Sequence, residues 1–359
     1  MIPREKLTRF GSSCEDGAAF PKRPLVGRVL LAATVLAATV ANLIWVFLGW
    51  GPLTADYTVF WEAARFPVER IYFAPKPFVY PPPAIPFFKT LALIQFWPGF
   101  ILWTVASAGA FYLAASRLTD RRTALLSLLS VSAVQNLILG QTAMLLGAAI
   151  LFAFTIPAFS GGLILGIVAV TKPQLLVMAP LVLLVRRDWP MLQGAALGSI
   201  GAILTSLAIF GVQPWTDWIN GMSRFHQALI DMDVLLSAIT PAAKAERLGI
   251  DPMPILALGM FLAITTVILL ARRLEGVGLV ALVVGTSTLA VPYALPHDIV
   301  ALVPACITYI IAKPGFKALP AMLVFGGAVI PAAIAAISGY KSLKVIIFRG
   351  ETTAVARAE

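Results

Sequence analysis

The sequence contains few charged residues, few cysteines and few histidines. Charged side chains make up only 12% of the 359 residues and hydrophobic ones 59%, whereas a soluble globular protein carries about 25% charged residues. A compact water-soluble fold is therefore disfavoured, and we predict an integral membrane protein. Cys14 and Cys306 lie in segments of different character, so no disulfide framework is expected. His226 and His297 are too few for a histidine-built metal site, and we predict neither a metal nor a cofactor.

The excess of basic over acidic residues is assigned mainly to membrane topology. Lys and Arg total 27 and Asp and Glu total 17, which gives a formal net charge of +10. In a soluble protein this excess would suggest a nucleic-acid partner, but in a membrane protein basic residues gather in the cytoplasmic loops. We therefore predict membrane lipids and no nucleic acid as partners, with the arginine pairs 186–187 and 272–273 on the cytoplasmic side.

Long apolar runs separated by short polar loops predict an all-α bundle. At roughly 20 residues per span, the chain has room for about 10–12 transmembrane helices. The expected spans and shorter apolar stretches cover residues 25–50, 98–116, 124–139, 142–158, 160–171, 173–185, 190–211, 252–271, 277–295, 298–312 and 318–337. The first run is longer than the apolar part of a signal peptide and is interpreted as a span. One transmembrane domain, 25–338, then lies between a disordered basic cytoplasmic tail, 1–24, and a polar C-terminal tail, 339–359.

Two segments, 51–97 and 212–250, are expected on the extracytoplasmic face with interfacial helices. Prolines 81–83 cannot lie inside a regular helix, and the short run 84–97 predicts an interfacial or re-entrant helix. In the second segment, apolar side chains recur at helical spacing from Trp215 to Leu229. This spacing is typical of an amphipathic helix on a membrane surface.

Polar residues embedded in apolar sequence gather on one side of the membrane in this topology. An ionisable residue at the membrane is costly to bury and is therefore a candidate for function. The polar positions are Asp56, Glu62, Gly140–Gln141, Lys172–Pro173, Arg224, His226 and His297–Asp298.

Each candidate also has a structural interpretation that the sequence leaves open. Asp56 could cap the helix that runs to Phe66, and Asp298 could cap the span that it begins. Lys172 could extend its ammonium group to the membrane surface. Gln141 could belong to a helix-ending turn, and Arg224 could be a solvated charge.

The series of short motifs resembles glycosyltransferase family 87, a group of polyprenyl-phosphate-sugar-dependent transferases with the GT-C membrane fold. The resemblance covers about residues 50–310. The matching stretches are Asp56–Phe60 with Ala63, Tyr72, Phe78, Tyr80–Pro82, Gly140–Gln141, Lys172–Gln174, Pro292–Tyr293 and His297–Asp298.

The resemblance implies a multi-pass enzyme of the cell membrane with its active site on the extracytoplasmic face. Its substrates would be a polyprenyl-phosphate-sugar donor, expected to carry mannose, and a glycan or glycolipid acceptor. Asp56 aligns with the first-loop aspartate that acts as the base in this fold, and inversion at the sugar is expected. Lys172 and His297 fall in motifs near the lipid phosphate. The further donor-binding candidates are Gln141, Arg224 and Tyr80.

A transporter or a lipid-sugar flippase is the alternative from another functional class. Transporters commonly consist of two related halves with charges near the bilayer midplane. This sequence shows no such halves, and its polar residues gather on one face. The enzyme interpretation is therefore preferred.

Overall fold

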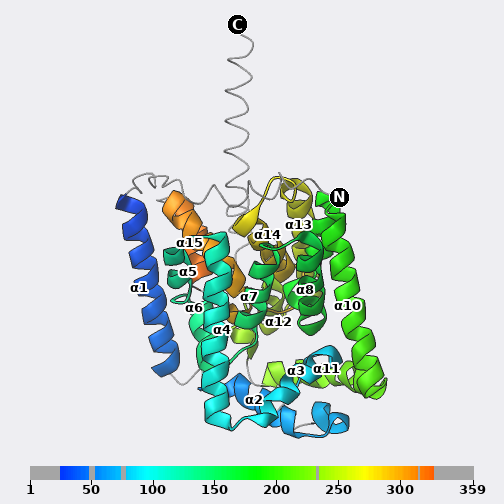
Figure 1. Ribbon diagram of the computed structural model, residues 1–359. Helices are drawn as coiled ribbons and strands as arrows, with labels where there is room; N and C mark the ends of the chain where they lie inside the picture. Colours follow the sequence, from blue (N-terminus) through cyan, green and yellow to red (C-terminus); the bar gives the residue numbers. More distant parts are fainter. Residues whose placement is uncertain (1–24, 48–52, 74–77, 232–233, 314–315, 327–359) are drawn as a thin grey trace.

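The computed structural model describes residues 25–47, 53–73, 78–231, 234–313 and 316–326. Within these residues every regular element is a helix, which confirms the all-α prediction (Figure 1). The predicted tails, 1–24 and 339–359, lie outside the described residues, as does most of the expected span 318–337, of which only α16, Leu319–Phe325, is described. The domain division at residues 25 and 338 thus stays a prediction.

Among the described residues, four helices are long and apolar enough to cross a membrane. They are α1 (Leu25–Phe47), α4 (Phe96–Leu118), α10 (Trp189–Phe210) and α13 (Pro252–Leu270), with 19 to 23 residues each. At about 1.5 Å per residue these lengths correspond to roughly 28–35 Å, which matches the hydrocarbon core of a bilayer. The protein is therefore a polytopic membrane protein, with an architecture consistent with a GT-C-like bundle.

Shorter apolar helices fill the space between the long ones. Helices α5 (Arg121–Ser127) and α6 (Val131–Leu139) are bent by 60° relative to each other, and together they form a fifth candidate span. The others are α7 (Ala143–Ala153), α8 (Ala158–Thr171), η5 (Pro173–Leu175), α9 (Ala179–Arg186), α14 (Gly276–Leu289), η7 (Pro296–Leu302), α15 (Val303–Ala312) and η8 (Phe316–Ala318). Nearly all of α14 is buried, so it belongs to the interior of the bundle. The figure of about 10–12 spans includes such short helices, and the total stays a prediction.

Helices α8 and α10 pack with their backbones in contact. A Cβ atom on Gly162 would lie 2.1 Å from the Met191 carbonyl oxygen, and one on Gly166 would lie 2.1 Å from that of Ala195. From the other side, a Cβ on Gly194 would lie 2.1 Å from the Phe159 carbonyl oxygen. Small residues four apart permit this close approach between membrane helices. The packing fixes the end of α8, and with it the position of the residue that follows, Lys172.

Several short helices and the amphipathic helix α11 cover one end of the bundle, where Figure 1 shows α2, α3 and α11 together. They are α2 (Ala55–Arg65), η2 (Val68–Phe73), η3 (Pro82–Ala84), α3 (Ile85–Lys89), η4 (Thr90–Leu93), α11 (Gln213–Asp231), η6 (Val234–Leu236) and α12 (Pro241–Arg247). The amphipathic helix expected in 212–250 is α11. A single helix over 84–97 is wrong, because this stretch is divided among η3, α3, η4 and the start of α4.

An aromatic cluster holds α2 in place. The ring of Tyr57 meets that of Phe100 edge to face at 5.5 Å between centroids, and Phe60 meets Phe88 at 4.8 Å. Thr54, the residue before α2, donates its backbone N–H to the Ile138 carbonyl at 2.9 Å. Together these contacts fix the first turn of α2 against the end of α6.

Candidate active site

Asp56 is the second residue of α2 and does not cap it. The N-cap position belongs to Thr54, whose φ is 67°. The interpretation of Asp56 as a helix cap is therefore wrong. Its carboxyl is partly buried, and burial raises its pKa to about 6, while a hydrogen bond from Gln141 and the charge of Lys172 act in the opposite direction. A carboxylate with this pKa is ionised at neutral pH and can accept a proton from a hydroxyl.

Gln141 belongs to a helix-ending turn and also reaches Asp56. Gly140, with φ 72°, ends α6, and the Gln141 backbone N–H donates to the Asn136 carbonyl at 2.9 Å. The Gln141 Oε1 accepts from the Thr142 backbone N–H at 3.1 Å, which leaves the amide nitrogen for the Asp56 carboxylate. The interpretation of Gln141 as part of a helix-ending turn is confirmed, and this turn aims its side chain at Asp56.

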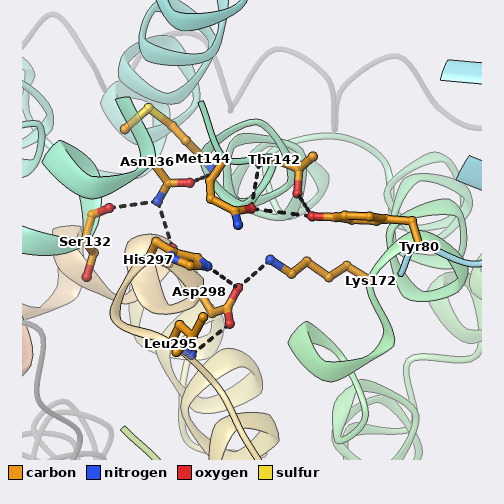
Figure 2. A network of polar contacts seen from close by, with 10 residues as sticks. Tyr80, Ser132, Asn136, Thr142, Met144, Lys172, Leu295, His297 and Asp298 are labelled. Atoms are coloured by element: carbon orange, nitrogen blue, oxygen red, sulfur yellow. Dashed lines mark hydrogen bonds and ion pairs between the residues drawn. The ribbon is translucent and has the colours of Figure 1, made fainter. Parts of the chain in front are cut away.

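Lys172 forms a buried ion pair with Asp298. The distance from Lys172 Nζ to Asp298 Oδ1 is 2.5 Å, and the two side chains are 7% and 3% exposed (Figure 2). The other Asp298 oxygen, Oδ2, accepts from the Leu295 backbone N–H at 3.0 Å at the start of η7. Asp298 is therefore the N3 residue of η7, and its side chain caps the helix start through the backbone of the N-cap residue, Leu295. The idea that Lys172 extends to the membrane surface is wrong, because its side chain points inward to Asp298.

Tyr80 and His297 lie around this ion pair. The Tyr80 hydroxyl is 2.5 Å from the Thr142 Oγ1, and the Tyr80 ring centroid is 6.0 Å from Lys172 Nζ. The His297 Nε2 is 3.8 Å from Asp298 Oδ1, a distance too long for a hydrogen bond. Figure 2 shows the side chains of Tyr80, Thr142, Lys172, His297 and Asp298 close together, with His297 and Asp298 both on η7.

Arg224 does not join this cluster. It lies exposed on α11, with its guanidinium carbon 5.1 Å from the centroid of the Phe73 ring. The structure thus brings together five of the six predicted site residues, Asp56, Tyr80, Gln141, Lys172 and His297, and leaves Arg224 at the surface. Among the described residues, no group of three or more potential metal-ligating side chains occurs.

Comparison with known proteins connects this geometry to a family. The sequence profile of glycosyltransferase family 87 matches residues 78–295, more than half of the chain. The chain belongs to glycosyltransferase family 87. A search of curated proteins and a search of solved structures gave no match. This family 87 protein is therefore a membrane glycosyltransferase, which uses a sugar donor and an acceptor. The transporter or flippase alternative is disfavoured.

The matched region contains part of the cluster in this family 87 glycosyltransferase. Tyr80, Gln141 and Lys172 lie within it, whereas Asp56 precedes it and His297 follows it. Asp56 and His297 are therefore connected to the matched region only through their neighbours in the cluster.

Two polar residues of this cluster, Asp298 and Asn136, are not among the six predicted site residues. Asp298 belongs to the predicted polar positions and to the His297–Asp298 motif, but the only specific role predicted for it is that of a helix cap. Asn136 was not considered, because it lies in the apolar stretch 124–139. The available signal was the pair of amide side chains Gln135 and Asn136 in a stretch expected inside the bundle, where an unpaired polar group is costly.

Proposed function

We propose that this transferase moves a hexose, mannose, from a polyprenyl monophosphate to a hydroxyl group of an extracytoplasmic glycan or glycolipid, with inversion. The observation that carries the proposal is the pairing of a base and a cation in one site. The Asp56 carboxyl accepts a hydrogen bond from Gln141, and it interacts electrostatically with the charges of Lys172 and Asp298. A carboxylate and a buried ammonium in one site supply what this reaction requires.

In the proposed reaction, Asp56 accepts the proton of the acceptor hydroxyl while that oxygen attacks the anomeric carbon. The bond between the anomeric carbon and the phosphate oxygen breaks, and its electron pair stays on the departing polyprenyl phosphate. Phosphate has a second pKa of about 6, so it leaves without a general acid. Glycosidases, in contrast, need a second carboxyl to protonate an alkoxide. Attack from the face opposite the phosphate inverts the anomeric centre.

Lys172 stabilises the phosphate in this proposal. An ammonium group has three N–H donors, and the contact with Asp298 uses one of them. The remaining donors are available to phosphate oxygens as negative charge develops. Asp298 holds the ammonium at its place, and His297 and Tyr80 border the same space.

Two arginine pairs support an extracytoplasmic site. The Arg186 Nη1 donates to the Ala271 carbonyl at 2.6 Å, and the Arg272 Nε donates to the Val185 carbonyl at 2.7 Å, so both pairs lie at one end of the bundle. Helix α10 begins next to them at Trp189 and leads away to α11. Arginines concentrate on the cytoplasmic side, which supports placing α11 and α2 on the other side.

The test is product formation by the purified protein in lipid nanodiscs. Synthetic polyprenyl-phosphate-mannose and its glucose analogue are supplied with candidate acceptors, and products are identified by mass spectrometry and their anomeric configuration by NMR. We expect an inverted mannoside from the wild type and loss of product with Asp56→Asn. Glu62→Gln, on the same helix, is the matched control with retained activity. Wild-type turnover by Asp56→Asn contradicts the role of Asp56, and product from a sugar nucleotide instead contradicts the donor class.

A further inference from the structure

Asn136 lies in the interior of the bundle and uses both ends of its amide. Its Nδ2 donates to the His297 carbonyl at 2.8 Å and to the Ser132 carbonyl at 2.8 Å. Its Oδ1 accepts from the Met144 backbone N–H at 2.8 Å. The residue is 2% exposed, and Figure 2 shows its side chain between Ser132, His297 and Met144.

These bonds connect the two halves of the active site. Asn136 lies on α6, and the turn that follows this helix carries Gln141, the partner of Asp56. Its bond to the His297 carbonyl holds η7, which carries Asp298, the partner of Lys172. The side chain of Asn136 thus directly connects the helix before Gln141 with the segment that carries Asp298.

A replacement that removes the amide leaves specific groups without partners. Both N–H donors of the Asn136 amide are used, and each accepting or donating backbone group is buried. Leaving a buried donor or acceptor unsatisfied destabilises the folded state. The displacement that relieves this cost would separate η7 from α6, which changes the distance between the two halves of the site.

We propose that Asn136 is a positioning residue, which sets the separation of the Asp56–Gln141 pair from the Lys172–Asp298 pair. This proposal rests on the proposed function. Asn136 contacts none of the reacting groups and acts through Gln141 and Asp298. Misplacement of reacting groups by about 1 Å costs on the order of 100-fold in rate, so geometry of this kind governs kcat.

The kinetic test compares Asn136→Ala and Asn136→Asp with the wild type. For Asn136→Ala we expect kcat to fall by about 10- to 100-fold while the KM for donor changes little. For Asn136→Asp we expect kcat to fall as the pH rises above 7, where the wild-type rate is constant, because the protonated acid still donates one hydrogen bond and the carboxylate donates none. The matched control is Asn42→Ala, which removes a buried amide that bonds to no atom of the described residues. We expect that variant to retain the wild-type kcat.

A second readout does not depend on turnover. The titration of Asp56 is followed by infrared spectroscopy of labelled aspartate, with Asp56→Asn to assign the band. We expect Asn136→Ala to shift this titration, whereas Asn42→Ala leaves it unchanged. Wild-type kcat and an unchanged Asp56 titration in Asn136→Ala overturn the proposal, even if that variant unfolds at a lower temperature. No product from the wild type with any polyprenyl-phosphate-hexose refutes the proposed function instead, and the titration then still decides the positioning role.

Discussion

The Lys172 ammonium and the Asp298 carboxylate lie 2.5 Å apart, and both are almost completely buried. Each charge is stable there only because the other compensates it, since an isolated buried charge is strongly destabilising. The pair joins the loop after α8 to η7, two segments far apart in the sequence. It therefore contributes to the fold as well as to the proposed chemistry.

Removing one member of this pair is expected to destabilise the protein. Lys172→Met leaves the Asp298 carboxylate buried without its cation, at a cost of about 3–5 kcal/mol. The double variant Lys172→Met/Asp298→Asn leaves no buried charge and keeps the contact to the Leu295 backbone N–H, so we expect it to be more stable than Lys172→Met. Unfolding in detergent measures both, with the exposed Arg122→Met as the control. A double variant less stable than Lys172→Met would show that the ion pair is not the source of the effect.

The rate of the proposed transfer should depend on the ionisation of Asp56. The base must be deprotonated, and burial raises the pKa of Asp56 to about 6. We therefore expect kcat/KM to be constant above pH 7 and to fall about tenfold per pH unit well below pH 6. The Lys172→Arg variant, which keeps the positive charge near Asp56, should retain this profile. A profile that is flat between pH 5 and 8 is incompatible with Asp56 as the base.

Length and hydropathy predicted the long spans because a membrane sets the length of an apolar helix. The starts and ends of α1, α10 and α13 lie within a few residues of the predicted runs. The helix proposed over 84–97 failed for a related reason, since proximity to Pro81–Pro83 favours short turns whose positions hydropathy does not specify.

The candidate residues could be selected from the sequence, but not their contacts. An isolated polar residue in an apolar run is visible, as with Lys172 and Gln141. That Lys172 meets Asp298 follows from the packing of α8 against α10 and from the position of η7, which depend on the whole bundle. Arg224 fitted the pattern equally well, yet it lies on the exposed face of α11, because an amphipathic pattern does not specify where the polar face points.

The same raised pKa predicts that Asp56 costs stability at neutral pH. The folded-state pKa of about 6 lies above the ordinary value of 3.8, so the folded protein binds this proton more tightly than the unfolded chain does. Stability is therefore lost as the pH rises from about 4 through 6, by at most about 3 kcal/mol at 1.36 kcal/mol per pKa unit. Asp56→Asn removes this loss.

We expect Asp56→Asn to unfold at a higher temperature than the wild type at pH 8 and at nearly the same temperature at pH 4. Glu62→Gln, on the same helix, serves as the control for a change of net charge. An Asp56→Asn variant that is less stable than the wild type at pH 8 would show that the carboxylate stabilises the fold, contrary to this prediction.

The packing of α8 against α10 provides the last prediction. A Cβ atom on Gly166 would lie 2.1 Å from the Ala195 carbonyl oxygen, which is backbone and cannot rotate away. Gly166→Ala must therefore separate the two helices and move the end of α8, where Lys172 begins its path to Asp298. We expect a loss of about 1–3 kcal/mol in stability together with reduced transfer activity.

Gly201 on α10 is the matched control, because a Cβ atom there meets no atom within 4 Å. Gly201→Ala should be neutral or slightly stabilising, since alanine is favoured over glycine in a helix by about 1 kcal/mol. Unfolding in detergent and transfer assays on both variants measure the difference. If Gly166→Ala is as stable and active as Gly201→Ala, close contact between α8 and α10 does not position Lys172, and the ion pair with Asp298 must be held from the η7 side.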